Sequence, residues 1–379
     1  MFDTDVLIVG AGPTGLTLAA NLAAHHVDTT VVDGLAAGAN TSRAAAVNAR
    51  TLEVLEDLDV SRRLVKAGLQ VPRFIIRDRA RTLIPIDFAS LPTAYPYTLT
   101  IPQCDTEQLL LERLTELGGT VQRPTTLVAL TQDDDGATAT LDDGRTLRAR
   151  YVVGADGMRS TVRQSAGIGF GGSEYPESFM LADVHLQGEV SAAEVVLFWE
   201  RAGLTVVAPL PDGRYRVVAP MADAPDTPTA DVVQRLLDER GLGRGRVTVT
   251  DVSWSSRFRI HHRVADTYRN GRLLLAGDAA HVHSPAGGQG MNLGIQDAIA
   301  LSDSLIRVLA GEPENLLDDY AQSRRPYAEQ VLSLTSRMTR LATVPPAVRP
   351  LRNMGLGLAG SIPAVRAALA WRLSGLVYR

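Results

Sequence analysis

A glycine-rich turn near the start of the chain is the first pattern whose residue types and spacing could do chemistry. The aliphatic run at 6–9 leads directly into the sequence GAGPTG, and Asp33 ends the next aliphatic run. Gly10 permits a tight turn, Gly12 lets the backbone approach a diphosphate, and Gly15 lets a helix pack closely on the strand. Main-chain N–H groups at the start of that helix would bind the diphosphate, and the Asp33 carboxylate would bind ribose hydroxyls. The turn therefore predicts a dinucleotide-binding site.

Two further observations limit which cofactor the motif predicts and which of its two matches is a binding site. A carboxylate at position 33 disfavours a 2′-phosphate, so we do not expect NADP at this site, whereas NAD and FAD both remain open. A second match to the motif spans 355–360, but an Arg-Pro-Leu-Arg segment precedes it where a buried strand is required, and no acidic residue follows it. We interpret the second match as a loop or a helix-packing segment.

Two acidic turns follow buried strands further along the chain. The aliphatic run 151–153 leads into the sequence GADG at 154–157, and the run 273–276 leads into Gly-Asp at 277–278. The sequence SPAGGQGMN at 284–292 then precedes a long predicted helix. An acidic turn after a buried strand repeats the arrangement at Asp33, so these segments are expected to meet the first turn.

In these three motifs and their order, the sequence resembles the FAD-dependent aromatic hydroxylases, the class A flavoprotein monooxygenases of the para-hydroxybenzoate hydroxylase type. The resemblance covers most of the chain and is to their polyketide-hydroxylase branch. Many members carry a further thioredoxin-like C-terminal domain, which we expect this chain to lack. The resemblance implies FAD as the cofactor, with Asp278 holding a ribityl hydroxyl and Asp156 in a turn that serves both FAD and NADPH.

The resemblance implies three more contacts to the cofactor. Arg43 and Gln103 match positions that contact the flavin in relatives, and Leu127 would lie beside the adenine through its backbone. Relatives commonly have arginine after the acidic residue of the second strand, where this chain has Gly34, which puts one adenosine-side contact in question. The predicted cofactor-binding residues are Gly10, Gly12, Pro13, Thr14, Gly15, Asp33, Gly34, Arg43, Gln103, Leu127, Asp156, Gly277, Asp278, Pro285, Gly288, Gly290, Met291 and Asn292.

The loop at 284–292 suits a flavin on physical grounds as well. A reduced flavin carries negative charge along its pyrimidine edge, and unpaired N–H groups at the start of the helix 291–309 would face that edge. Glycines at 287, 288 and 290 leave room above the ring for oxygen and substrate. Pro285 fixes the start of the loop, and Pro285 and Arg43 are the side chains we place near the reacting ring.

The resemblance implies an enzyme with a two-stage reaction. NADPH or NADH reduces FAD as a transient co-substrate without a domain of its own, and the flavin swings outward to meet it. Dioxygen then forms a flavin hydroperoxide, which transfers one oxygen atom to an electron-rich aromatic ring. Because the cofactor carries this chemistry, no nucleophilic side chain is expected.

Hydroxylation has three rivals among flavin chemistries. A Baeyer–Villiger-type oxygenase and a flavin-dependent dehydrogenase that inserts no oxygen remain alternatives. A halogenase is not expected, because no W-x-W-x-I-P segment occurs and the lysine Lys66 lies in the wrong region.

The substrate would lie between the flavin and an inserted sheet. Tyr97, Phe179 and Trp199 are the aromatic candidates for substrate contact, and each is equally consistent with core packing. No isolated charged residue on the predicted strands suggests a clamp for the carboxylate of a small benzoate. We therefore favour a bulky, apolar polycyclic aromatic substrate of the polyketide type.

The first strand, helix and strand predict a doubly wound parallel sheet, an α/β Rossmann-type fold. Within this part we predict helices at 16–24, 48–58 and 106–117, the last with Thr106 as its N-cap residue. A sheet-rich substrate domain is inserted, and helices end the chain. The predicted FAD-binding domain with the C-terminal helices comprises 1–72, 98–174 and 269–379, and the substrate domain comprises 73–97 and 175–268.

Composition narrows the class of protein. Of the 379 residues, 45% are apolar and 21% are charged, which excludes disorder, and a net charge of −4 gives no field that attracts nucleic acid. A single cysteine, Cys104, excludes an intramolecular disulfide, and His281 and His283 lack further ligands for a metal ion. No apolar stretch approaches the roughly 18 residues of a membrane span, and the acidic N-terminus is unlike a signal peptide. We predict a cytoplasmic protein and leave homo-oligomerisation open.

The last fifty residues contain seven arginines and no acidic residue after Glu329. Prolines at 345, 346, 350 and 363 divide this segment into short predicted helices. The arginines could form a surface that faces a partner or a membrane, or they could be the solvated side of a helical cap. We favour the cap.

Overall fold

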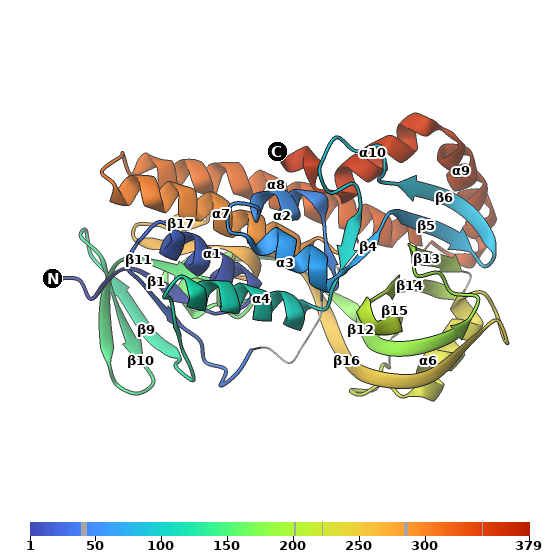
Figure 1. Cartoon of the computed structure of the whole chain (residues 1–379), viewed down its shortest axis with the longest axis horizontal. Helices are drawn as coiled ribbons and strands as arrows, with labels where there is room; N and C mark the ends of the chain where they lie inside the picture. Colours follow the sequence, from blue (N-terminus) through green and yellow to red (C-terminus); the bar gives the residue numbers. More distant parts are fainter. Residues whose placement is uncertain (39–43, 201, 222, 284–286, 343) are drawn as a thin grey trace.

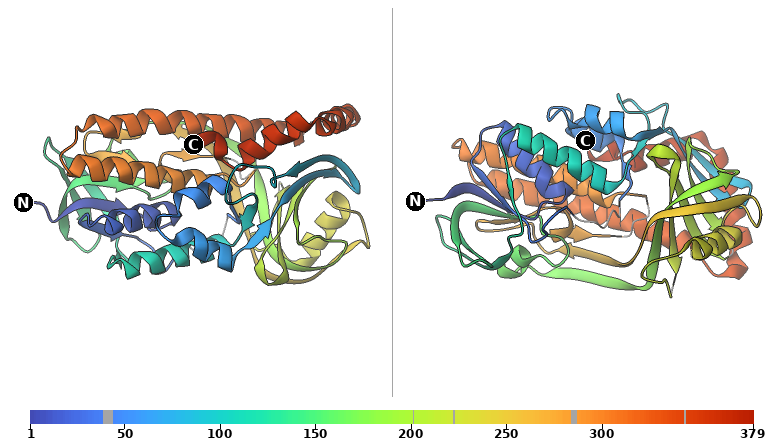
Figure 2. Two further views of the ribbon diagram at one scale, coloured as in Figure 1. Left: turned by 45° about the horizontal axis from the view of Figure 1, so that its top comes forward. Right: turned by 60° about the horizontal axis from the view of Figure 1, so that its bottom comes forward.

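The computed structural model describes residues 1–38, 44–200, 202–221, 223–283, 287–342 and 344–379. It is an elongated molecule with one large sheet toward each end, as Figure 1 shows. Helix α7 (Gly290–Leu309) packs on the first sheet, and the long helix α8 (Asn315–Ala342) runs beside α7 toward the second sheet (Figures 1 and 2).

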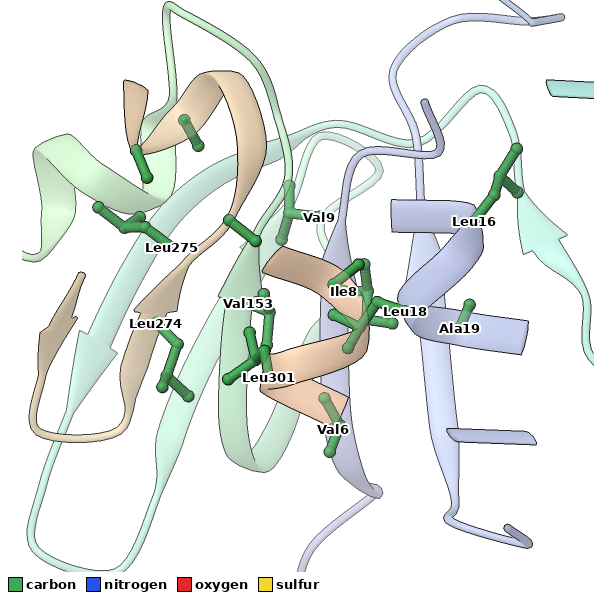
Figure 3. Close-up of a cluster of buried hydrophobic side chains, with 14 of the residues drawn as sticks. Val6, Ile8, Val9, Leu16, Leu18, Ala19, Val153, Leu274, Leu275 and Leu301 are labelled. Carbon is green, nitrogen blue, oxygen red and sulfur yellow. The ribbon is translucent and has the colours of Figure 1, made fainter. Parts of the chain in front are cut away.

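The first sheet confirms the predicted Rossmann-type fold. Its strands are β1 (Thr4–Val9), β2 (Thr29–Val32), β8 (Val121–Gln122), β9 (Leu127–Gln132), β10 (Ala137–Leu141), β11 (Thr146–Gly154), β17 (Arg269–Asn270) and β18 (Leu273–Leu275). The order is β17-β18-β11-β1-β2-β8, with β18, β11, β1, β2 and β8 parallel and β9–β10 as an antiparallel extension of β11. Helix α1 (Pro13–Ala24) connects β1 to β2. Figure 3 shows Val6 and Ile8 of β1 between Leu18 of α1 and Leu301 of α7, in the core that fixes the glycine turn.

The second sheet gathers segments that are far apart in the sequence. Its strands are β5 (Arg73–Asp78), β6 (Arg81–Asp87), β12 (Phe170–Gly188), β13 (Glu194–Glu200), β14 (Gly203–Pro209), β15 (Arg214–Met221), β16 (Val247–Ala265) and β19 (His281–Val282). Their order is β19-β16-β12-β15-β14-β13-β5-β6, so the excursion at 73–97 joins the segment at 175–268 through the parallel pair β5–β13. The boundary predicted at 174/175 falls inside β12, which pairs with β16 on both sides of a register shift between Glu174 and Ser178.

The remaining elements cover the two sheets and connect them. The helices are α2 (Ala49–Val54), α3 (Val60–Ala67), α4 (Gln103–Glu116), α5 (Thr161–Ser165), α6 (Ala230–Arg240), α9 (Arg349–Ser361) and α10 (Pro363–Leu373), and a small sheet contains β3 (Ala46–Val47), β4 (Leu69–Val71) and β7 (Thr98–Thr100).

Two helix predictions were wrong at their ends. Helix α4 begins at Gln103 rather than after Thr106, because Pro102 takes the N-cap position and the Thr106 hydroxyl donates back to the Pro102 carbonyl at 3.5 Å. The helix predicted over 48–58 ends at Val54. The chain turns before α3 at Asp59, which has a left-handed backbone (φ 60°) that stops a continuous helix.

The C-terminal helices include one longer than predicted. Helix α8 continues through Pro326 to Ala342, whereas α9 and α10 are separate, as the prolines indicate. The second glycine motif lies within α9, where a Cβ on Gly360 would stand 2.2 Å from the Leu83 carbonyl oxygen, so this glycine permits close packing on β6. Among the described residues, no single helix is long and apolar enough to cross a membrane, and only the bent pair α9–α10 passes that test by length and composition.

Candidate active site

One cavity of about 940 Å³ is lined by both sheets and the loops between them. It brings together these residues predicted to contact the cofactor or the substrate: Gly12, Pro13, Thr14, Gln103, Phe179, Asp278, Gly288, Gly290 and Met291. Arg43 and Pro285 lie outside the described residues.

The glycine turn at the start of α1 is shaped for a diphosphate. A Cβ on Gly10 (φ +104°) would stand 2.3 Å from the Ala155 carbonyl oxygen, and one on Gly15 would stand 1.9 Å from the Gly10 carbonyl oxygen. Gly12 instead has no atom within 4 Å of its Cβ position, and no side chain caps the N-terminus of α1. Gly10 and Gly15 therefore pack against protein backbone, whereas Gly12 faces open space. The main-chain N–H groups at the start of α1 are available to bind an anion there. These residues fit the diphosphate of FAD.

Asp33 is held against this turn. Its carboxylate accepts hydrogen bonds from the Ala11 N–H at 2.6 Å and the Leu35 N–H at 2.8 Å. A Cβ on Gly34 would stand 2.9 Å from Thr126 Oγ1, so a larger residue at this position would require Thr126 to shift. The backbone of Leu127 pairs with Leu141 at the start of β9, and its side chain is buried.

The Asp156 turn borders the cavity, but its carboxylate faces α5. Asp156 Oδ2 accepts hydrogen bonds from the N–H groups of Thr161 at 2.7 Å and Val162 at 3.2 Å, so it caps that helix. Burial raises the pKa of Asp156 above its usual range. The neighbouring residues Ala155 and Gly157 line the cavity.

A buried charge network supports the turn that presents Asp278. A Cβ on Gly277 (φ +61°) would stand 2.5 Å from Thr14 Oγ1, so this turn packs on the start of α1. Asp297 of α7 accepts from Arg324 Nε at 2.7 Å, and its other oxygen lies 2.6 Å from His281 Nε2. Although burial acts to raise it, Arg324 and His281 hold the pKa of Asp297 below its usual range. Within the described ranges, no three His, Cys, Asp or Glu side chains form a metal site.

Asn292 ties the glycine loop to the rest of the site. Its Nδ2 donates to the carbonyl oxygens of Gly288 at 2.7 Å and Ala46 at 2.8 Å, and its Oδ1 accepts from the Asn48 N–H at 2.8 Å. No side chain caps the N-terminus of α7, which therefore faces the cavity with main-chain donors beside Gly290. Asn292 is buried and acts by holding the loop in place.

The second sheet supplies a mostly apolar wall. Its cavity-lining side chains are Phe74, Ile76, Ile86, Phe179, Leu181, Val195, Leu197, Leu204, Val206, Ala208, Val218 and Phe258. Phe179 packs on Phe258 with ring centroids 5.7 Å apart. The structure does not bring Tyr97 or Trp199 to this wall. Trp199 is 3% exposed and lies under Arg352 of α9, and Tyr97 packs on Tyr95.

Comparison with known proteins agrees with this geometry. A family model described as "FAD binding domain" matches residues 3–335. The chain is 40% identical to the 6-methylpretetramide 4-monooxygenase of Streptomyces rimosus over 362 residues, which are 93% of this chain and 64% of that protein. It is also 40% identical to the rifampicin monooxygenase of Streptomyces venezuelae, over 92% of this chain and 74% of that protein. The chain belongs to the FAD-dependent aromatic hydroxylases of the para-hydroxybenzoate hydroxylase-like class.

A solved structure extends the similarity to the fold. The p-nitrophenol 4-monooxygenase PnpA of Pseudomonas putida superposes with a TM-score of 0.85 at 28% identity, and the match covers 97% of each chain. This chain spans less than two thirds of the length of the 6-methylpretetramide 4-monooxygenase.

Two arginines at this site are not among the residues predicted from the sequence. Arg216 of β15 lines the cavity and binds Asp183 of β12 through two hydrogen bonds of 2.7 and 2.8 Å. Because Arg216 is paired with Asp183, it is not an isolated charge, and the expectation that no isolated charge on these strands suggests a carboxylate clamp stays a prediction. In the sequence, Asp183 follows the apolar run Met180–Ala182 and Arg216 precedes the apolar run Val217–Ala219, so each charged residue stands at the edge of an apolar run. Arg123, which follows β8, donates to the Ala11 carbonyl oxygen at 3.0 Å and lies 3.8 Å from Asp33 Oδ2.

Proposed function

We propose that this chain is an FAD-dependent monooxygenase that hydroxylates an aromatic, polycyclic substrate of the polyketide type with NADPH or NADH and O2. The observation that carries the proposal is the single cavity that extends from the glycine turn to the apolar wall of the second sheet. Its volume of about 940 Å³ is at the upper end of the usual range for ligand sites, about 300–1,000 Å³. The names of the two monooxygenase relatives support the polycyclic class.

The protein's own contribution begins with binding. The N-terminus of α1 and the open face of Gly12 would hold the diphosphate of FAD, and Asp33 and Asp278 would bind hydroxyl groups of the ribose and the ribityl chain. FAD supplies the electron transfer from the nicotinamide and the activation of dioxygen. The N–H groups at the start of α7 would face the edge of the flavin ring that becomes negative on reduction.

The remaining task is to position the substrate and exclude water. The aliphatic side chains of β13 and β14 and the ring of Phe179 offer a broad apolar surface to a fused ring system. Removing this surface from water favours binding of an apolar substrate at roughly 25 cal/mol per Å² buried. Arg216 places a positive charge at this wall, beside the segment at Ala44. We keep the cytoplasm as the predicted location.

An anaerobic reduction experiment tests the proposal. The FAD-loaded protein is mixed with NADPH or NADH, and the loss of flavin absorbance is followed with and without polycyclic phenols. We expect a phenol of the right shape to accelerate the loss, because it occupies the wall of the second sheet. Admission of air should then give a product that contains one additional oxygen atom on the ring, detected by mass spectrometry.

Other outcomes assign the chain to the alternative chemistries. Reduction and reoxidation without an oxygenated product would indicate a flavin-dependent dehydrogenase. Oxygen inserted between a carbonyl carbon and its neighbour, giving an ester or lactone, would indicate a Baeyer–Villiger-type reaction. Both outcomes contradict ring hydroxylation.

A further inference from the structure

The outer face of α9 carries a row of exposed apolar side chains. Val348, Leu351, Met354, Leu358 and Ile362 are 45, 64, 54, 63 and 49% exposed. Their spacing of three or four residues places them on one side of the helix. We call these five residues the α9 row. Such a contiguous apolar row at the surface marks an interaction site more often than isolated exposed residues do.

The polar side chains of α9 lie on its inner side. Arg352 is buried and donates to the carbonyl oxygens of Trp199, Leu341 and Ala342. Asn353 is also buried, and its Nδ2 donates to Asp78 of β5. Figures 1 and 2 show α9 beside the hairpin β5–β6, at one end of the molecule's long axis. The α9 row therefore lies on a projecting end of the molecule.

Exposed arginines lie next to α9 on two neighbouring elements. Arg340 is exposed in the last turn of α8, whose end is tied to α9 because the Leu341 and Ala342 carbonyls accept from Arg352. Arg81 of the hairpin contacts α9, since a Cβ on Gly357 would stand 3.7 Å from Arg81 Nη2. An apolar helix face flanked by cations is complementary to the acyl and phosphate layers of an anionic bilayer.

We propose that the α9 row is a peripheral docking surface for an anionic lipid bilayer. The row would enter the boundary between headgroups and acyl chains, with the flanking arginines on lipid phosphates. A second copy of the chain fits this face less well, because the C-terminal segments of two copies would bring arginines together without an acidic residue of their own. The proposal does not depend on the hydroxylase activity.

Sedimentation with lipid vesicles tests this surface. The full-length, FAD-loaded protein is mixed with vesicles of phosphatidylcholine alone or of phosphatidylcholine with phosphatidylglycerol. We expect binding to the vesicles that contain phosphatidylglycerol. Salt should weaken this binding, because the Debye length falls to about 3 Å at 1 M ionic strength. Replacement of Leu351, Met354 and Leu358 by glutamine should lower the binding constant at least tenfold, roughly the effect of losing partial apolar burial. Arg81→Gln and Arg340→Gln should each lower it about fivefold.

Matched controls distinguish docking through the α9 row from nonspecific adsorption and from misfolding. Val128→Gln removes another exposed aliphatic side chain, 54% exposed, from the opposite end of the molecule, and Arg62→Gln removes an exposed arginine of α3; neither should change binding. Melting temperature and bound FAD show that the triple variant is folded. Absence of binding, or equal binding to both kinds of vesicle, overturns the proposal. It is also overturned if light scattering finds a dimer that the triple variant dissociates while vesicles are not bound.

Discussion

Arg216 of β15 donates from Nη1 to the carbonyl oxygen of Ala44 at 2.7 Å, and this bond joins the second sheet to the segment that precedes β3. The guanidinium is fixed by Asp183, and the two side chains are only 2 and 4% exposed. The Ala44 N–H in turn donates to Gln103 Oε1 at 3.1 Å. Arg216, Ala44 and Gln103 all line the cavity. One chain of hydrogen bonds therefore connects the apolar wall of the second sheet to the start of α4.

Arg216→Met should destabilise the protein by about 3–5 kcal/mol, because it leaves the Asp183 carboxylate buried without its cation. The double variant Arg216→Met with Asp183→Leu should recover most of this loss, since no charge then remains buried. Urea unfolding of the two variants measures the difference. Equal stability of the single and double variants would contradict the argument. If Arg216 also serves the reaction, the refolded double variant should still lose acceleration of flavin reduction by substrate.

Asp297→Asn should lower stability at neutral pH and much less in acid. The folded pKa of Asp297 lies below its ordinary value of 3.8, so its stabilisation is complete above that value and is lost as the pH falls through the folded pKa. The free energies of unfolding of wild type and variant, measured at pH 7 and at successively lower pH below 3.8, should therefore converge as the pH falls through the folded pKa. A difference that stays constant with pH would show that the carboxylate charge contributes nothing.

Asp303→Asn, also in α7, is a control that should change the free energy of unfolding in the opposite direction. Burial raises the pKa of Asp303, so its ionised form costs free energy at neutral pH and this cost disappears as the pH falls through the raised value. Because Asp303 is nevertheless exposed at the surface, solvent screening keeps the expected gain in stability of the variant at neutral pH small, and the gain should vanish in acid.

The dinucleotide-binding unit could be predicted from sequence because its signals are local. The strand at 6–9, the glycine turn and the next strand are consecutive, and Gly10 and Gly15 have steric reasons that act within the unit or against Ala155. The ends of helices are harder to predict where two local signals compete. At the start of α4, both Pro102 and Thr106 are candidates for the N-cap position. Helix-period apolar residues at 52, 55 and 58 are buried as expected, although the backbone between them is not one helix.

The rest of the site depends on contacts between distant segments. Arg216 and Asp183 are adjacent only because β12 and β15 pair in antiparallel register. Trp199 shares a strand with the cavity-lining Val195 and Leu197, but α9, from a segment about 150 residues later, covers it. A single sequence states neither which strands pair nor which helix covers their ends.

Arg123→Ala should weaken binding of FAD about tenfold and leave binding of FMN nearly unchanged. Arg123 holds the Ala11 carbonyl and lies beside Asp33, at the end of the site where the adenosine half of FAD would bind, and FMN lacks that half. The factor corresponds to the loss of one charged hydrogen bond, about 1.5 kcal/mol. Fluorescence titration of the apoprotein measures both affinities. Arg113→Ala, which also removes an arginine–carbonyl bond, to Leu58 at 2.8 Å, should change neither.

Gly12→Ala should leave the fold intact and lower FAD affinity at least tenfold. The Gly12 backbone (φ −77°, ψ −174°) is open to any residue, and its Cβ position has no neighbour within 4 Å, so the loss of stability should stay below about 1 kcal/mol. The added methyl group would nevertheless stand where the diphosphate approaches the backbone. Gly355→Ala is the matched control, because its Cβ position is also open but lies in α9. Unchanged FAD affinity in Gly12→Ala, measured by fluorescence titration, would mean that the diphosphate does not cross this turn, and the assignment of the α1 N-terminus would have to be withdrawn.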